Sequence, residues 1–285
     1  MIASFFVMFG RGVRLALATG VALASLAVST GGQVRAGVTP VGGLLTGVAG
    51  QYGTIKGRLV YGGDPVPAPE VLIEKGKSEK DPTVCAVSET IYSKALVVDA
   101  KTKGIRYGFA YLVRPKGSNP DAVKALVVKA DKVTVDQKNC EFVPHVVAIH
   151  QDQTLEFKSS DAANHNVNLH AFTNLAMNQI MAPGGTVEKR LVAERRPIQL
   201  TCDIHPWMKA YIMVFDHPFF AVTGDDGSFE IRGVPPGEQK LVIWQESVGY
   251  TTQGAAQGMP VTVEADKTTD VGEIRLDPSR VRLSR

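Results

Sequence analysis

One octapeptide places three metal-binding side-chain types in a single short loop. Residues 201–208 (TCDIHPWM) carry a thiol, an imidazole and a thioether at C-x2-H-x2-M spacing. The residues on either side, 197–201 (PIQLT) and 210–215 (AYIMVF), are typical of strands. A short loop between two antiparallel strands can direct several side chains at one point, and Pro206 limits the conformations of this loop. The octapeptide therefore predicts a β-hairpin that ends in a binding site.

A second imidazole, that of His165, lies upstream after another strand-like run. Residues 153–158 (QTLEFK) alternate between polar and apolar side chains, as a half-buried strand does. Two histidines and one cysteine in a trigonal plane, with a weak axial methionine, are the ligands of a blue-copper electron-transfer site. The sequence thus predicts a copper site at one end of a β-sandwich, with the ligands His165, Cys202, His205 and Met208.

Four segments, in order, resemble the cupredoxins, and amicyanin and plastocyanin in particular: 142–144 (FVP), 151–157 (QDQTLEF), 163–167 (ANHNV) and 202–208 (CDIHPWM). The short spacing from His205 to Met208 is similar to that of the amicyanin loop. The resemblance covers residues 130–216 and implies a Greek-key β-sandwich. It implies that His165, Cys202 and His205 are equatorial ligands of one type 1 copper ion and that Met208 is the axial ligand.

The resemblance also implies how such a site would work. The backbone N–H of Asn166 would donate to the copper-bound sulfur and tie the two ligand loops together. Electrons would pass through the exposed edge of His205, with Pro206 and Trp207 as an apolar docking face, unless Trp207 packs beneath the loop. The expected function is one-electron transfer with a redox protein, such as a periplasmic cytochrome or dehydrogenase, and not enzymatic catalysis. The sequence shows no nucleophile–base pair or phosphate loop, which agrees with a function other than catalysis.

Other functions stay open from the sequence. One cysteine and two histidines also suit a tetrahedral zinc site. A copper-storage or delivery protein is an alternative, although this chain lacks Met- or His-rich tracts. A structural exported β-protein with a vestigial or zinc-occupied site is another. The remaining histidines are expected to be surface or structural residues, and two further methionines to be packing residues: His145, His150, His170, His217, Met177 and Met181.

The start of the chain predicts export. Arg11 and Arg14 precede an uncharged apolar stretch at 15–28, and Val34-Arg35-Ala36 is an A-x-A-like cleavage site. Residues 1–36 therefore resemble a signal peptide, and the apolar stretch is short for a transmembrane helix. An uncleaved N-terminal anchor is the alternative. We expect a periplasmic or secreted protein with no stable membrane span after cleavage, beginning with a Gly-rich flexible leader at 37–52.

The chain has three cysteines, and their number agrees with export if one of them is a metal ligand. If Cys202 is a metal ligand, Cys85 and Cys140 remain as a pair in an oxidising compartment, and we hypothesise that they form a disulfide. Closing the loop between Cys85 and Cys140 would stabilise the fold by roughly 4 kcal/mol in the chain-entropy model.

The net charge of the chain excludes one class of function. Lys and Arg number 31 and Asp and Glu 28, so the charge gives no indication of nucleic-acid binding.

The residues outside the predicted copper domain indicate a second sandwich. Residues 221–231 (AVTGDDGSFEI) read as two strands joined at Asp226-Gly227, and 239–244 (QKLVIW) as another strand. They resemble a carboxypeptidase-regulatory, transthyretin-like module, whose opening strand is similar to 53–61. The expected protein is all-β. It has an N-terminal β region at 53–125, a cupredoxin domain at 126–216, this second, Ig-like β-sandwich module at 217–278 and a tail at 279–285. The cupredoxin domain is either inserted into one Ig-like sandwich or the second of three successive units.

Overall fold

The computed structural model describes residues 52–282, so the predicted signal peptide, nearly all of the predicted leader and the last three residues lie outside it. Within this range the regular structure is almost entirely β-strand, which confirms the predicted all-β class. The described helices are α1 (Pro120–Lys129) and the short 3-10 turns η1 (Ala255–Gln257) and η2 (Pro278–Arg280). None of them is long and apolar enough to cross a membrane.

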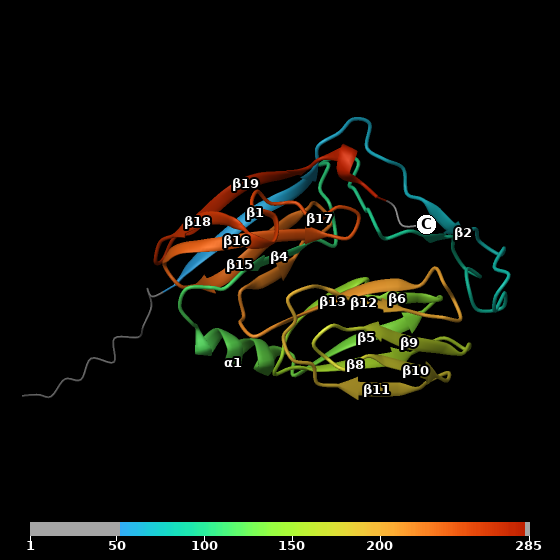
Figure 1. Cartoon of the computed structure of the whole chain (residues 1–285). Helices are drawn as coiled ribbons and strands as arrows, with labels where there is room; N and C mark the ends of the chain where they lie inside the picture. Colours follow the sequence, from blue (N-terminus) through green and yellow to red (C-terminus); the bar gives the residue numbers. More distant parts are fainter. Residues whose placement is uncertain (1–51, 283–285) are drawn as a thin grey trace, which may run out of the picture. The chain divides into compact units, whose positions relative to one another are not determined.

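Residues 132–215 form two sheets around one core (Figure 1). One sheet has the strand order β10-β9-β12-β13-β7 and the other the order β11-β8-β5-β6. The strands are β5 (Lys132–Lys138), β6 (Glu141–Val143), β7 (Val146–His150), β8 (Thr154–Ser159), β9 (His165–His170), β10 (Met177–Met181), β11 (Thr186–Lys189), β12 (Ile198–Thr201) and β13 (Lys209–Phe215).

Side-chain alternation explains how these strands pack. On β8, Leu155 and Phe157 are buried in the core while Glu156 and Lys158 lie on the other face. Residues one position apart on a strand point to opposite faces, so a register shift of one residue would expose both apolar side chains. The alternation predicted for this strand is thus the reason that it forms one face of the core.

Strand pairing positions the predicted ligands, of which His165 begins β9 and the others lie in the loop between β12 and β13. β12 pairs with β9 in antiparallel register, with Leu200 opposite Leu169 and Thr201 opposite Asn168. Cys202 follows Thr201 directly and therefore arrives beside the beginning of β9, where His165 lies. β12 also pairs with β13, so the residues between them form a closed hairpin loop.

Strands from both sides of residues 132–215 share two further sheets (Figure 1). β1 pairs with β15 and β19, and β4 pairs with β14 and β16, which also pairs with β17 and β18. This pairing is consistent with the predicted insertion, and the domain boundaries stay a prediction. The strands are β1 (Gly53–Tyr61), β4 (Phe109–Leu112), β14 (Phe220–Val222), β15 (Ser228–Val234), β16 (Gly237–Gln245), β17 (Gly249–Tyr250), β18 (Met259–Val263) and β19 (Thr268–Leu276).

Two features of the N-terminal region differ from simple strands and turns. Helix α1 spans the expected boundary at residue 125, so the predicted β region 53–125 ends in a helix. It begins because the side chain of Asn119 accepts a hydrogen bond from the Ala122 N–H at 2.9 Å and Pro120 occupies the first turn. Between β2 (Val71–Ile73) and β3 (Ile91–Tyr92), residues 74–90 form an irregular segment.

A chain that ends at Asp216 should keep the sandwich of residues 132–215 but lose β1 and β4, because their partner strands are missing. Limited proteolysis of the full and shortened chains measures this. New cleavage within residues 53–112 is expected only in the shortened chain, with residues 132–215 protected in both. A protease-resistant N-terminal region in the shortened chain would instead indicate three successive units.

Candidate metal centre

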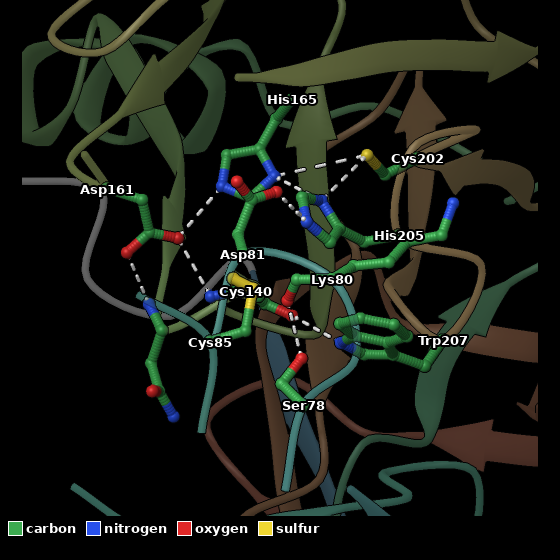
Figure 2. The surroundings of a disulfide bond; sticks show 11 residues. Ser78, Lys80, Asp81, Cys85, Cys140, Asp161, His165, Cys202, His205 and Trp207 are labelled. Atoms are coloured by element: carbon green, nitrogen blue, oxygen red, sulfur yellow. Dashed lines mark hydrogen bonds and ion pairs between the residues drawn. A yellow bond between two sulfur atoms is a disulfide. The ribbon is translucent and has the colours of Figure 1, made fainter. Parts of the chain in front are cut away.

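The structure brings three of the predicted ligands together at one end of the 132–215 sandwich (Figure 2). The Sγ atom of Cys202 lies 4.0 Å from Nδ1 of His165 and 3.7 Å from Nδ1 of His205. The two Nδ1 atoms are 3.0 Å apart. Both histidines are 0% exposed and Cys202 is 1% exposed. Three donor atoms thus form one buried triangle.

The size of this triangle fits a metal ion. With metal–nitrogen distances of about 2.0–2.1 Å and metal–sulfur distances of about 2.3 Å, donors around one ion lie roughly 3.3–3.8 Å apart. The observed separations of 3.0, 3.7 and 4.0 Å bracket that range. These distances suit copper and zinc alike, since the two ions bind imidazole and thiolate at similar distances.

A carboxylate holds each imidazole from behind (Figure 2). Nε2 of His165 lies 2.9 Å from Oδ2 of Asp161, and Nε2 of His205 lies 2.9 Å from Oδ2 of Asp81. An ionised carboxylate only accepts hydrogen bonds, so this network assigns the proton of each ring to Nε2. In the neutral form of each ring, the lone pair of Nδ1 then faces the sulfur of Cys202. The lone pairs of the two Nδ1 atoms and of the sulfur then converge and repel one another unless a proton or a cation lies between them. Donors that converge in this way are typical of a metal site.

The protonation equilibria of the metal-free site follow from the same contacts. Burial would raise the pKa of Cys202, but hydrogen bonds from His165, His205 and the Asn166 N–H outweigh it and lower this pKa to about 6. Burial likewise opposes the charged form of His165, yet its bonds to Asp161 and Cys202 raise its pKa to about 9. Without a metal, Cys202 is therefore a thiolate at neutral pH, and His165 carries a second proton on Nδ1, between the ring and the sulfur.

The loop that carries Met208 is closed by its own backbone. The N–H of Cys202 donates to the carbonyl of Met208 at 3.3 Å, and the N–H of Met208 donates to the carbonyl of His205 at 2.9 Å. Met208 is 1% exposed and belongs to the same core cluster as Cys202. The side chain of Met208 is thus buried beside the loop, and its role as axial ligand stays a prediction.

Asn166 lies on β9 and connects this strand to the loop that carries Cys202. Its backbone N–H lies 3.5 Å from Sγ of Cys202, and its side chain both accepts from the Asp203 N–H and donates to the Asp203 carboxylate. Asn168 and Asn178 donate to the same carboxylate, and all three bonds lower the pKa of Asp203. The loop after Cys202 is therefore anchored by an ionised carboxylate on three amide side chains.

Cys85 and Cys140 form a disulfide beside the site, with their Cα atoms 5.2 Å apart. Each of their sulfur atoms lies within 4.8 Å of a ring nitrogen of His205. Trp207 also packs here: its indole N–H donates to the carbonyl of Cys140 at 3.1 Å, and its ring centre lies 5.1 Å from that of His205. Trp207 is half-buried, and with the exposed Pro206 it lines a cavity of about 680 Å³.

The expectation of an exposed His205 edge is wrong for this structure. The His205 ring is fully buried because Asp81 lies against Nε2 and Trp207 lies against the ring. The remaining histidines lie outside the triangle: His145 pairs with Glu246 in a buried contact of 2.6 Å, and His170 contacts Thr201.

Sequence reasoning did not identify three acidic residues around the site. Asp161 precedes His165 by four residues and could have been noticed from that spacing. Asp203 follows Cys202 directly, but its role depends on asparagines from β9 and β10. Asp81 is 124 residues away from His205 and left no local signal in the sequence.

Comparison with known proteins gives limited similarity. No protein-family model and no curated protein match the chain. The Cu-containing nitrite reductase (NirK) from Thermus scotoductus SA-01 is similar over 30% of this chain and 22% of its own, at 22% identity and TM-score 0.27. A reduced Cu(I) form of an amicyanin mutant (17% identity, TM-score 0.26) and a purple cupredoxin from Nitrosopumilus maritimus (17%, 0.25) are each similar over 30% of this chain and over 82% and 98% of theirs. These TM-scores are low, so the similarity does not define a function.

The thiol of Cys202 should titrate with a pKa of about 6 in the metal-free protein, because His165, His205 and Asn166 stabilise its thiolate. An unperturbed thiol titrates near pH 8.5, about 2.5 units higher. Thiolate ultraviolet absorbance followed against pH measures this, and Cys202 is the one free cysteine of the chain. The titration should vanish in Cys202→Ser. A midpoint near 8.5 would show that the thiol lacks these donors.

Proposed function

We propose that residues 132–215 are a cupredoxin domain that binds one copper ion through His165, Cys202 and His205, with Met208 as the axial ligand. The observation that carries this proposal is the buried triangle of two imidazole nitrogens and one sulfur, in which both rings already present Nδ1. Soft thiolate and imidazole donors together suit copper. When bound, copper would supply a one-electron couple between Cu(I) and Cu(II).

The residues around the triangle would keep its geometry constant. Asp161 and Asp81 hold the two rings, and Asn166 holds the sulfur through its backbone N–H. Cys202 and His205 are separated by two residues in a loop closed by backbone hydrogen bonds. A site that does not rearrange between oxidation states requires little reorganisation for each electron transfer, which suits a carrier.

We infer an electron carrier and not an enzyme from the burial of the site. The three donors are at most 1% exposed, so a substrate molecule would have no direct access to a metal that they hold. An electron requires no such access. Burial also disfavours a storage or delivery role, because a metal that is handed on must reach a partner's ligands. The partner would be a redox protein, such as a cytochrome or dehydrogenase, that meets the protein after export.

The docking face would be formed by Pro206 and Trp207. His205 is covered, whereas Pro206 is exposed and Trp207 lies between the cavity and the imidazole of His205. An electron leaving the site in this direction would cross one aromatic ring in contact with a ligand. A partner docked at this cavity would therefore approach the site without displacing Asp81.

Addition of Cu(II) to the metal-free protein should produce an intense blue thiolate-to-copper charge-transfer band with one ion bound per chain. Cys202→Ser should abolish the band, because it removes the thiolate. Optical titration, with zinc as the competing ion, measures both. Tight zinc binding without a blue band would support the zinc alternative, and the absence of any metal binding would support a vestigial site.

Met208→Leu should retain copper yet raise its reduction potential, because loss of the axial thioether destabilises Cu(II) more than Cu(I). Voltammetry of the wild-type and variant proteins measures the potential. Met177→Leu, on β10 outside the ligand loop, is the matched control and should leave the potential unchanged. Loss of all copper from Met208→Leu would show that Met208 holds the metal more strongly than an axial ligand does.

A further inference from the structure

A segment from outside the 132–215 sandwich reaches the candidate metal centre. On this segment, residues 74–90, Asp81 places its Oδ2 atom 2.9 Å from Nε2 of His205 (Figure 2). The His205 side chain is 0% exposed, whereas that of Asp81 is 42% exposed. The carboxylate therefore occupies the edge of the imidazole at which solvent would otherwise hydrate Nε2.

Backbone contacts fix Asp81 relative to Cys85. The carbonyl of Asp81 accepts hydrogen bonds from the N–H groups of Val84 and Cys85, each at 2.8 Å. Asp81 itself has a φ of 44°, a left-handed conformation that Asp and Asn tolerate better than most residues. The turn between Asp81 and Cys85 is thus closed by two backbone hydrogen bonds, so the position of Cys85 determines where the backbone of Asp81 lies.

The disulfide attaches this turn to the sandwich. Cys85 is bonded to Cys140, which lies between β5 and β6, and both residues are 0% exposed. The N–H of Cys140 donates to Oδ2 of Asp161, the carboxylate that contacts His165, at 2.8 Å. The disulfide and this hydrogen bond thereby connect the turn that carries Asp81 to the carboxylate behind His165. Asp161 precedes His165 by four residues, but Asp81 is brought to His205 only by the tertiary fold.

We propose that Asp81 is a positioning residue of the metal centre, held against His205 by the Cys85–Cys140 disulfide. The inference rests on the proposed function, in which His205 is a ligand. By accepting a hydrogen bond from Nε2–H, Asp81 fixes the rotation of the ring and the tautomer whose Nδ1 lone pair faces Cys202, and it makes that nitrogen a stronger donor. The segment 74–90 is then part of the site as well as its cover.

Asp81→Asn tests the role of the carboxylate. Asparagine keeps the side-chain volume and tolerates the left-handed backbone, so the change removes mainly the negative charge. The affinity for Cu(II), measured by competition with a chelator, should fall by about 10- to 100-fold. The reduction potential should rise, because Cu(II) depends more than Cu(I) on the negative charge behind its ligand. Glu79→Gln removes an equal charge from the same exposed stretch and should change neither quantity.

The melting temperature of the metal-free protein separates positioning from folding. It should be the same in the wild type and in both variants, since Asp81 is partly solvated. In nuclear magnetic resonance spectra of the metal-free wild type, the Nε2 proton of His205 should exchange slowly with water, and it should exchange faster in Asp81→Asn. An Asp81→Asn protein with the affinity and potential of Glu79→Gln would overturn the proposal. Failure of the wild type itself to bind copper would overturn the proposed function.

A double-mutant cycle tests the part played by the disulfide. The variant Cys85→Ser/Cys140→Ser should also bind Cu(II) more weakly than the wild type, because the turn that carries Asp81 is no longer attached. Adding Asp81→Asn to it should cause little further loss, since contacting groups that act through one another are not additive. Losses that add in full, or an unchanged affinity in the serine variant, would contradict attachment through the disulfide.

Discussion

The antiparallel pairing of β9 with β12 is the interaction on which the candidate site depends. It sets Thr201 opposite Asn168, and so places the beginning of one strand beside the end of the other. Because side chains alternate along a strand, a slip of one residue would turn His165 and the core residues after it to the other face. The apolar side chains that fix this register, among them Val167 and Leu200, are fully buried in the same core as Cys202. Core packing and ligand geometry are therefore set by the same contacts.

The sequence was sufficient to predict that His165, Cys202 and His205 would meet. The loop between β12 and β13 holds two of them, which is a local signal. The resemblance of residues 163–167 to the cupredoxins, and not strand periodicity, identified His165 as the third. Helix α1 was not foreseen, although Asn119-Pro120 is a helix-start signature. Short β-branched runs dominate the composition and favour strands throughout the chain. A helix of ten residues is too short to alter this overall composition, so it was missed.

The surroundings of His205 could not be predicted from the sequence for a different physical reason. A contact between residues 124 positions apart leaves no periodic pattern and no fixed spacing. It depends on where an irregular segment is attached, and here the attachment is a disulfide whose pairing alone says nothing of what Asp81 touches. Resemblance to other proteins favoured an exposed imidazole edge at this point. The segment 74–90, which lies outside 132–215, covers the imidazole edge of His205 and leaves all the predicted ligands in place.

Covering a metal site has opposing physical effects. Excluding water strengthens the hydrogen bond from His165 to the buried Asp161, because electrostatic interactions are less screened in the protein interior, whereas Asp81 stays partly solvated. It also places a carboxylate where a redox partner would otherwise touch a ligand. In the proposed function, the half-buried Trp207 would resolve this conflict, since it contacts the His205 ring and also lines the cavity. Its indole N–H is fixed to the carbonyl of Cys140, so the disulfide that attaches the cover also orients the ring through which an electron could leave.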